Sequence, residues 1–159
     1  MLTFERISQF PRGTLAHQLA DAYSFRSDCR TYWAQDWQEY DDFFFDHPRI
    51  ADNCGFITVL DGTPVGHITW DPSSAPDLVI LGHNCICTEY KGRGLGKAQL
   101  QEAIRRIRKA GVRRITVTTN ALFLPAQRNY ESVGFILQDE RANTETPFAG
   151  SYIDYELFL

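Results

Sequence analysis

Several short segments of the chain alternate apolar and polar residues, and longer segments repeat apolar residues every third or fourth position. Alternation is typical of β-strands, and the longer period is typical of helices. Strands are predicted over residues 2–7, 55–60, 64–71, 78–87, 114–119, 135–138 and 152–158. Helices are predicted over residues 14–23, 30–46, 98–110 and 125–133. This mixture of helices and strands predicts a domain of the α/β class.

Three of these segments carry more specific expectations. Residues 78–87 form a long apolar run, which predicts a central strand buried on both faces. Thr14 begins a helix pattern and is expected to cap its first turn. The segment 30–46 is rich in aromatic residues, and we interpret its acidic side chains as a solvated helix face. These acidic residues are Asp36, Glu39, Asp41 and Asp42.

Composition restricts the class of protein. With 159 residues, 43% hydrophobic and 13% aromatic, the chain can bury the core of one domain over residues 1–159. The net charge of −4 gives no support for a nucleic-acid partner and favours an amine-bearing one. No run reaches the roughly 18 apolar residues of a membrane span, and no signal peptide is evident, so a cytoplasmic location without a membrane partner is expected. Few, irregularly spaced cysteines favour free thiols.

A glycine-rich segment, residues 90–97, separates the strand pattern 78–87 from the helix pattern 98–110. Such a turn exposes backbone N–H groups at a helix start and predicts an anion site. The P-loop pattern fails, because Lys91 stands at its first glycine and Ala98 at its hydroxyl position. The dinucleotide pattern fails as well, because its third glycine falls on Lys97 or Gln99. A turn whose glycines only permit positive φ stays open at this point.

The segment from Lys91 to Gly96 does fit the acyl-CoA pyrophosphate pattern [QR]-x-x-G-x-[GA], with Lys91 replacing Gln or Arg. Here the chain resembles the GNAT superfamily of N-acetyltransferases. A second stretch resembles that family's N-x-x-N-x-x-A-x-x-L-Y-E-x-x-G-F, with departures at Phe123 and Asn129. The matching residues are Asn120, Ala126, Tyr130, Glu131, Gly134 and Phe135. The two motifs stand in the family's order, and the resemblance extends from about residue 53 to the C-terminus.

The resemblance implies a GNAT-type acyl-CoA N-acyltransferase fold. In this fold a mixed, mostly antiparallel sheet is flanked by helices, and two parallel strands splay apart at the cofactor. It also implies transfer of an acetyl group from acetyl-CoA to a primary amine, by direct attack in a ternary complex and without a metal. Dimers are common among relatives, so a homodimer is one of the open states of assembly.

Residue roles are carried over by resemblance. The backbone of Ile86, Cys87 and Thr88 is expected to pair with the pantetheine arm, and one N–H group there would polarise the thioester carbonyl. Asn120 is expected to hydrogen-bond the arm, and Tyr130 to protonate the departing thiolate. The pyrophosphate would be held by the loop, which comprises Lys91, Gly92, Arg93, Gly94, Leu95, Gly96 and Lys97.

The general base is open. His83 is the first candidate, because its ordinary pKa lies near neutrality. Glu89, Glu39, Asp42 and a water chain are the alternatives. His83, Cys85 and Cys87 alternate along one strand, a pattern that would also fit a metal site or a nucleophilic thiol. Because relatives use direct attack, we interpret the cysteines as core thiols and predict no metal.

Two other functions stay open at this stage. A non-catalytic acyl-CoA-binding sensor or partner module could use the same fold, and so could an enzyme for a longer acyl group. The acceptor pocket is expected to come from residues 24–46 and 139–151, the stretches that the motifs cover least.

Overall fold

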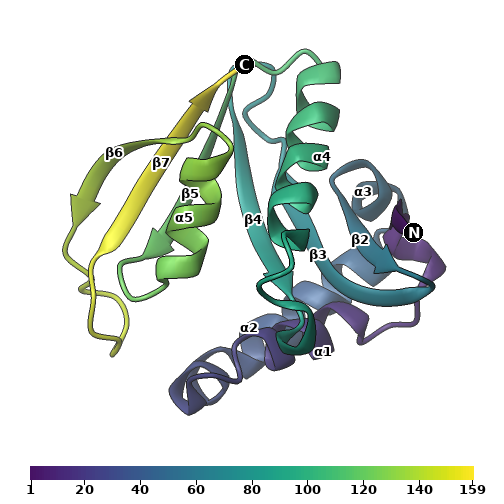
Figure 1. The fold of residues 1–159 in the computed structure, drawn as a ribbon, viewed down its shortest axis with the longest axis horizontal. Helices are drawn as coiled ribbons and strands as arrows, with labels where there is room; N and C mark the ends of the chain where they lie inside the picture. The colour runs from purple at the N-terminus through teal and green to yellow at the C-terminus, as the bar shows by residue number, and fades with distance from the viewer. The chain divides into compact units, whose positions relative to one another are not determined.

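The computed structural model describes residues 1–159 and contains one seven-stranded sheet with the strand order β1-β2-β3-β4-β5-β7-β6 (Figure 1). The neighbours β4 and β5 are parallel, whereas the pairs β1–β2, β2–β3, β5–β7 and β6–β7 are antiparallel. The predicted mixed, mostly antiparallel sheet is therefore confirmed. The strands are β1 (Leu2–Glu5), β2 (Gly55–Leu60), β3 (Thr63–Asp71), β4 (Val79–Ile86), β5 (Arg114–Asn120), β6 (Ile136–Arg141) and β7 (Tyr152–Phe158).

The helices follow the predicted pattern with three additions. The predicted helices are α1 (Thr14–Ala22), α2 (Ser27–Asp46), α4 (Leu95–Lys109) and α5 (Leu124–Ser132). The additional ones are α3 (Pro48–Asn53) and the 3₁₀ turns η1 (Ile7–Gln9) and η2 (Thr88–Tyr90). Each of these is six residues or shorter, which is too short to show a hydrophobic period. None of the helices combines the length and the hydrophobicity that a membrane-spanning segment requires.

The chain divides into two compact units. The first comprises Met1–Thr69 and His83–Gln99, and the second comprises Trp70–Gly82 and Leu100–Leu159. The single domain over residues 1–159 therefore stays a prediction. β4 and α4 each contribute residues to both units.

The first unit packs η1, α1, α2 and α3 against β1 and β2. Its core includes a cluster of buried residues on these elements. The cluster comprises Ile7, Leu15, Phe44, Ala51, Ile57 and Val59. α1 and α2 contact each other. The aromatic residues of α2 lie on two faces: Trp37 and Phe44 are buried, whereas Tyr32 and Phe43 are exposed.

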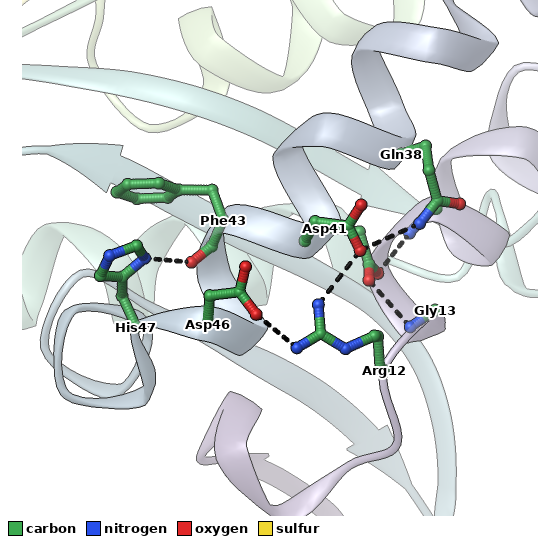
Figure 2. Close-up of polar contacts among 9 residues, drawn as sticks. Arg12, Gly13, Gln38, Asp41, Phe43, Asp46 and His47 are labelled. Carbon is green, nitrogen blue, oxygen red and sulfur yellow. Dashed lines mark hydrogen bonds and ion pairs between the residues drawn. The ribbon is translucent and has the colours of Figure 1, made fainter.

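The start of α1 corrects two predictions (Figure 2). Asp41 is fully buried instead of solvated, and its carboxylate accepts hydrogen bonds from the N–H groups of Gly13 at 2.8 Å and Ala16 at 3.0 Å. Asp41 therefore caps α1 from another helix. Thr14 does not cap it, because its hydroxyl donates to the carbonyl oxygen of Pro11 at 2.7 Å. The neighbouring acidic residues Asp42 and Asp46 both bind the guanidinium of Arg12.

The prediction that residues 78–87 are buried on both faces is wrong. Burial alternates in the first half of β4, where Val79 and Leu81 are buried but Ile80 is 42% exposed. The second half contains Gly82, His83 and Asn84, so the segment 78–87 is not apolar throughout. An alternating pattern of this kind is typical of a strand with one buried face.

The second unit is built on β5, β7 and β6. β7 pairs with β5 along its whole length, from Arg114–Phe158 to Asn120–Tyr152. Its buried side chains include Ile115, Val117, Ile153 and Tyr155. α5 lies against this sheet (Figure 1). The ring centre of its Tyr130 is 5.9 Å from that of Tyr155 in β7. β6 forms the end of the strand order and is exposed at every residue.

Candidate active site

The glycine segment between β4 and α4 has a backbone conformation suited to binding an anion. Gly92 and Gly94 have φ angles of +76° and +78°, and the residue between them does not have a positive φ. Such alternation turns successive N–H groups toward one side. The N–H of Ala98 donates to the carbonyl oxygen of Gly94 at 3.1 Å, which starts the helical bonding of α4. The N–H groups of Leu95, Gly96 and Lys97 precede that bond and have no carbonyl within the helix to bind.

Two basic side chains of this loop, those of Lys91 and Arg93, bind the protein itself. The ammonium group of Lys91 donates to the carbonyl oxygen of Ala22 at the end of α1 and lies 5.0 Å from the centre of the Phe25 ring. Partial burial lowers the pKa of Lys91. The guanidinium of Arg93 donates to the carbonyl oxygen of Glu89 at 3.1 Å. Lys91 and Arg93 therefore hold the loop in place, and its backbone N–H groups and the dipole of α4 are the features suited to an anion.

At the end of β4, the backbone N–H groups of the three residues predicted to contact pantetheine differ in their partners. The N–H of Cys87 donates to the carbonyl oxygen of Val65 in β3 at 2.8 Å. The N–H of Thr88 donates to the carboxylate of Asp21 at 2.6 Å. Backbone groups alternate between the two edges of a strand, so we infer from the Cys87 bond that the N–H of Ile86 is directed away from β3. Ile86 is thus the member of this set whose backbone is directed toward the other edge of β4.

β3 approaches β4 closely at Gly66, next to Cys85 and Ile86. A Cβ atom at Gly66 would lie 2.3 Å from the carbonyl oxygen of Cys85 and 3.1 Å from the Cα atom of Ile86. Only a glycine at position 66 lets β3 lie this close to β4.

His83 lies beside a buried polar cluster of the first unit. Its ring meets the Tyr40 ring edge-on at 4.6 Å, and burial lowers its pKa to about 4. His67 is fully buried behind it, with a pKa lowered to about 3 by burial. The Nδ1 atom of His67 lies 2.7 Å from the amide oxygen of Gln18. Both imidazoles are neutral at pH 7, so His83 can accept a proton but is a weak base.

The thiols of β4 are poorly suited to nucleophilic attack. Cys85 is buried 3.4 Å from the Nδ1 atom of His67, and burial raises its pKa far above the usual value. Burial also raises the pKa of Cys87 to about 11, and the nearby carboxylate of Asp21 adds to this shift. A thiol needs the thiolate form to act as a nucleophile. All four cysteines are free, and no group of three acidic, histidine or cysteine side chains could hold a metal.

The remaining predicted site residues belong to the second unit. Asn120 is buried, and its amide oxygen accepts the N–H of Leu122 at 2.9 Å while its amide nitrogen donates to the carbonyl oxygen of Gly150 at 3.3 Å. Asn120 therefore shapes the turn after β5, and its contact with pantetheine stays a prediction. Tyr130 is 5% exposed and packs on Phe135, with ring centres 5.6 Å apart. Its role as an acid also stays a prediction.

A sequence model of the acetyltransferase (GNAT) family matches residues 19–135. The match includes the glycine loop, Asn120 and Tyr130, and it covers well over half of the chain. The chain belongs to the GNAT acetyltransferase family. The resemblance inferred from two motifs is thereby confirmed, whereas no curated protein sequence matches the chain.

Solved structures share the GNAT fold. A GNAT-family protein from Desulfovibrio desulfuricans has a TM-score of 0.77 and 20% identity, over 99% of this chain and 98% of that one. The ribosomal-protein-S18-alanine N-acetyltransferase of Escherichia coli has a TM-score of 0.74 and 20% identity, over 99% and 94%. The PaiA N-acetyltransferase of Thermoplasma acidophilum, in complex with coenzyme A, has a TM-score of 0.78 and 14% identity, over 97% and 98%. At these identities the likeness shows the fold alone.

Two residues of this GNAT site were missed in the sequence. Gly66 carried a signal, because a glycine inside a strand pattern often marks a close backbone approach. Asp21 carried none. It lies at the end of α1, and only the fold brings its carboxylate to Thr88, whose hydroxyl in turn donates to the Asp21 carbonyl oxygen at 2.8 Å.

Proposed function

We propose that this protein transfers an acetyl group from acetyl-CoA to a primary amine. The observation that carries the proposal is the backbone cradle of Gly92 to Lys97, placed at the N-terminus of a 15-residue helix. A pyrophosphate matches this cradle in charge and in its need for several N–H donors. The structural relative from Thermoplasma acidophilum contains coenzyme A, which supports the same ligand here.

The proposed roles follow from the contacts of each residue. The backbone of the loop from Gly92 to Lys97 holds the pyrophosphate, while the side chains of Lys91 and Arg93 hold the loop to its neighbours. Ile86 offers the N–H group that polarises the thioester carbonyl. Cys87 and Thr88 already have backbone partners, so they line the pantetheine arm without donating an N–H group to it.

The reaction proceeds by direct attack. The amine nitrogen forms a bond to the thioester carbon, the carbon–sulfur bond breaks, and Tyr130 gives its phenolic proton to the departing thiolate. His83 or a water molecule takes the proton that the amine loses. An acyl-enzyme on Cys85 or Cys87 is disfavoured, because burial keeps both thiols protonated near neutral pH. The proposal includes one catalytic domain over residues 1–159.

Amine-dependent thiol release tests this proposal. Acetyl-CoA would be mixed with a panel of polyamines, amino acids, aminoglycosides and short peptides, and free thiol followed with a chromogenic reagent. Release with one class of amine is expected and would identify the acceptor class. Calorimetric titration with CoA would be run in parallel.

Gly94→Val tests the loop directly. Valine resists a φ angle of +78°, so the loop must change shape and CoA binding is expected to disappear. Gly62→Val is the matched control, because Gly62 has a φ of +82° in the β2–β3 turn and lies outside the loop. Undiminished CoA binding by Gly94→Val would contradict the assignment of the cradle.

One observation favours a second function. Burial lowers the pKa of His83 to about 4, so this residue is a weak general base, and a module that only binds acyl-CoA needs no base. Such a sensor or partner module would bind CoA tightly, yet no amine in the panel would release thiol from acetyl-CoA.

A further inference from the structure

Gln99 is a fully buried polar residue that connects α4 to three strands of the first unit. Its amide oxygen accepts the hydroxyl of Thr58 in β2 at 2.6 Å. Its amide nitrogen donates to the carbonyl oxygen of His67 in β3 at 2.9 Å. The same nitrogen lies 2.6 Å from the amide oxygen of Asn84 and 3.3 Å from the carbonyl oxygen of Cys85, both in β4.

The position of Gln99 in the chain gives these bonds their meaning. It lies two residues after Lys97, the last residue of the cradle, and its partner Cys85 immediately precedes Ile86. One amide group therefore joins the two segments to which we assign the pyrophosphate and the thioester. We propose that Gln99 is a positioning residue that fixes the distance between the cradle and the N–H group of Ile86. This inference rests on the proposed function.

The chemistry of the contact favours this role over simple packing. An apolar side chain could fill the same space between α4 and the sheet, but it would let the helix slide or rotate against the strands. Directional bonds select one arrangement, and a buried network is costly when a member is left unpaired. Both the oxygen and the nitrogen of the Gln99 amide are used, and its partner Thr58 is also fully buried.

A fixed distance matters because acetyl-CoA is one molecule held at two places. When two sites bind one ligand, the second contact is intramolecular only if the spacing matches the ligand. A misplacement of about 1 Å at a reacting group can cost about a hundredfold in rate. Removing the Gln99 bonds should therefore weaken binding of the complete CoA molecule more than binding of the fragment that contacts the cradle alone.

Gln99→Leu tests the inference by comparing two ligands. Calorimetry would measure binding of CoA and of 3′-phosphoadenosine 5′-diphosphate, the fragment that ends at the pyrophosphate. We expect CoA affinity to fall about tenfold and kcat by a similar factor or more, while fragment affinity stays within about twofold. An equal loss for both ligands, or no loss for either, would overturn the role.

Two further variants keep the test decisive. Thr58→Val removes one bond of the network and should give an intermediate loss of CoA affinity, even if Gln99→Leu does not fold. Ile104→Val trims a buried side chain on the same helix, so it should lower the unfolding temperature without changing the ratio of the two affinities. If the unaltered protein bound no CoA, the proposed function itself would fail, which is a different outcome from an unchanged ratio.

Discussion

Replacing Gly66 with alanine is expected to slow the reaction by displacing β4 at Ile86. The added Cβ atom would lie 2.3 Å from the carbonyl oxygen of Cys85, whereas the closest favourable carbon–oxygen contacts between strands are about 3.3 Å. The blocking oxygen belongs to the backbone, so rotation of a side chain cannot relieve the overlap. The two strands must therefore separate by about 1 Å at this point.

That displacement gives the expected magnitude. Ile86 follows Cys85 directly, and its N–H group is the proposed donor to the thioester carbonyl. A shift of about 1 Å at such a group can cost about a hundredfold, so kcat of Gly66→Ala should fall by about that factor. The glycine cradle lies outside the displaced segment, so binding of 3′-phosphoadenosine 5′-diphosphate should be retained.

Thiol release with the accepted amine measures kcat, and calorimetry measures the fragment. Gly62→Ala is the control, because a Cβ atom there meets no other atom within 4 Å although φ is +82°. It should lose stability through backbone strain yet keep its turnover. Equal turnover of the folded Gly66→Ala and Gly62→Ala proteins would refute the reasoning.

Three further predictions concern acid catalysis, capping and pH. Tyr130→Phe should lower kcat about a hundredfold with little change in CoA affinity, as general acids contribute at least that much; normal turnover would reduce Tyr130 to a packing role. Asp41→Asn should lower the free energy of unfolding in urea by about 2 kcal/mol, because a buried charged cap is lost. Asp42→Asn, at an ion pair whose side chains are 50% and 45% exposed, should change it by less than about 1 kcal/mol, and equal losses would contradict the cap. The pKa values of His67 and His83 lie at about 3 and about 4, below the ordinary 6.5, so below pH 6.5 the unfolded chain binds protons that the folded one does not. Stability should fall as the pH is lowered from 6.5 toward 4, by up to about 1.4 kcal/mol per pH unit for each histidine. A flat profile in urea titrations across this range would argue against their burial.

Much of the fold was readable from local patterns. β2 begins and ends where the alternation predicted, and α5 begins at Pro125 within one residue. The glycine loop was also readable, because Gly92 and Gly94 adopt the positive φ angles that glycine tolerates. These features depend on neighbouring residues only, so a sequence pattern contains the information needed to predict them.

The pairing of distant segments was decided by the tertiary structure alone. Asp41 is in a helix pattern that resembles a solvated face, yet it caps a helix that begins 27 residues earlier. In the sequence, the N–H groups of Ile86, Cys87 and Thr88 could not be distinguished. In the fold, the N–H of Cys87 binds β3 and the N–H of Thr88 binds Asp21.

The sequence by itself determined the family, the order of elements and the loop, because each of these depends on residue types at short spacing. The tertiary structure alone decided which backbone groups of β4 are directed away from β3, and that Gln99 joins α4 to β4. Hydrogen bonds are short and directional, so which groups meet depends on how the chain folds back on itself, and local spacing does not contain that information.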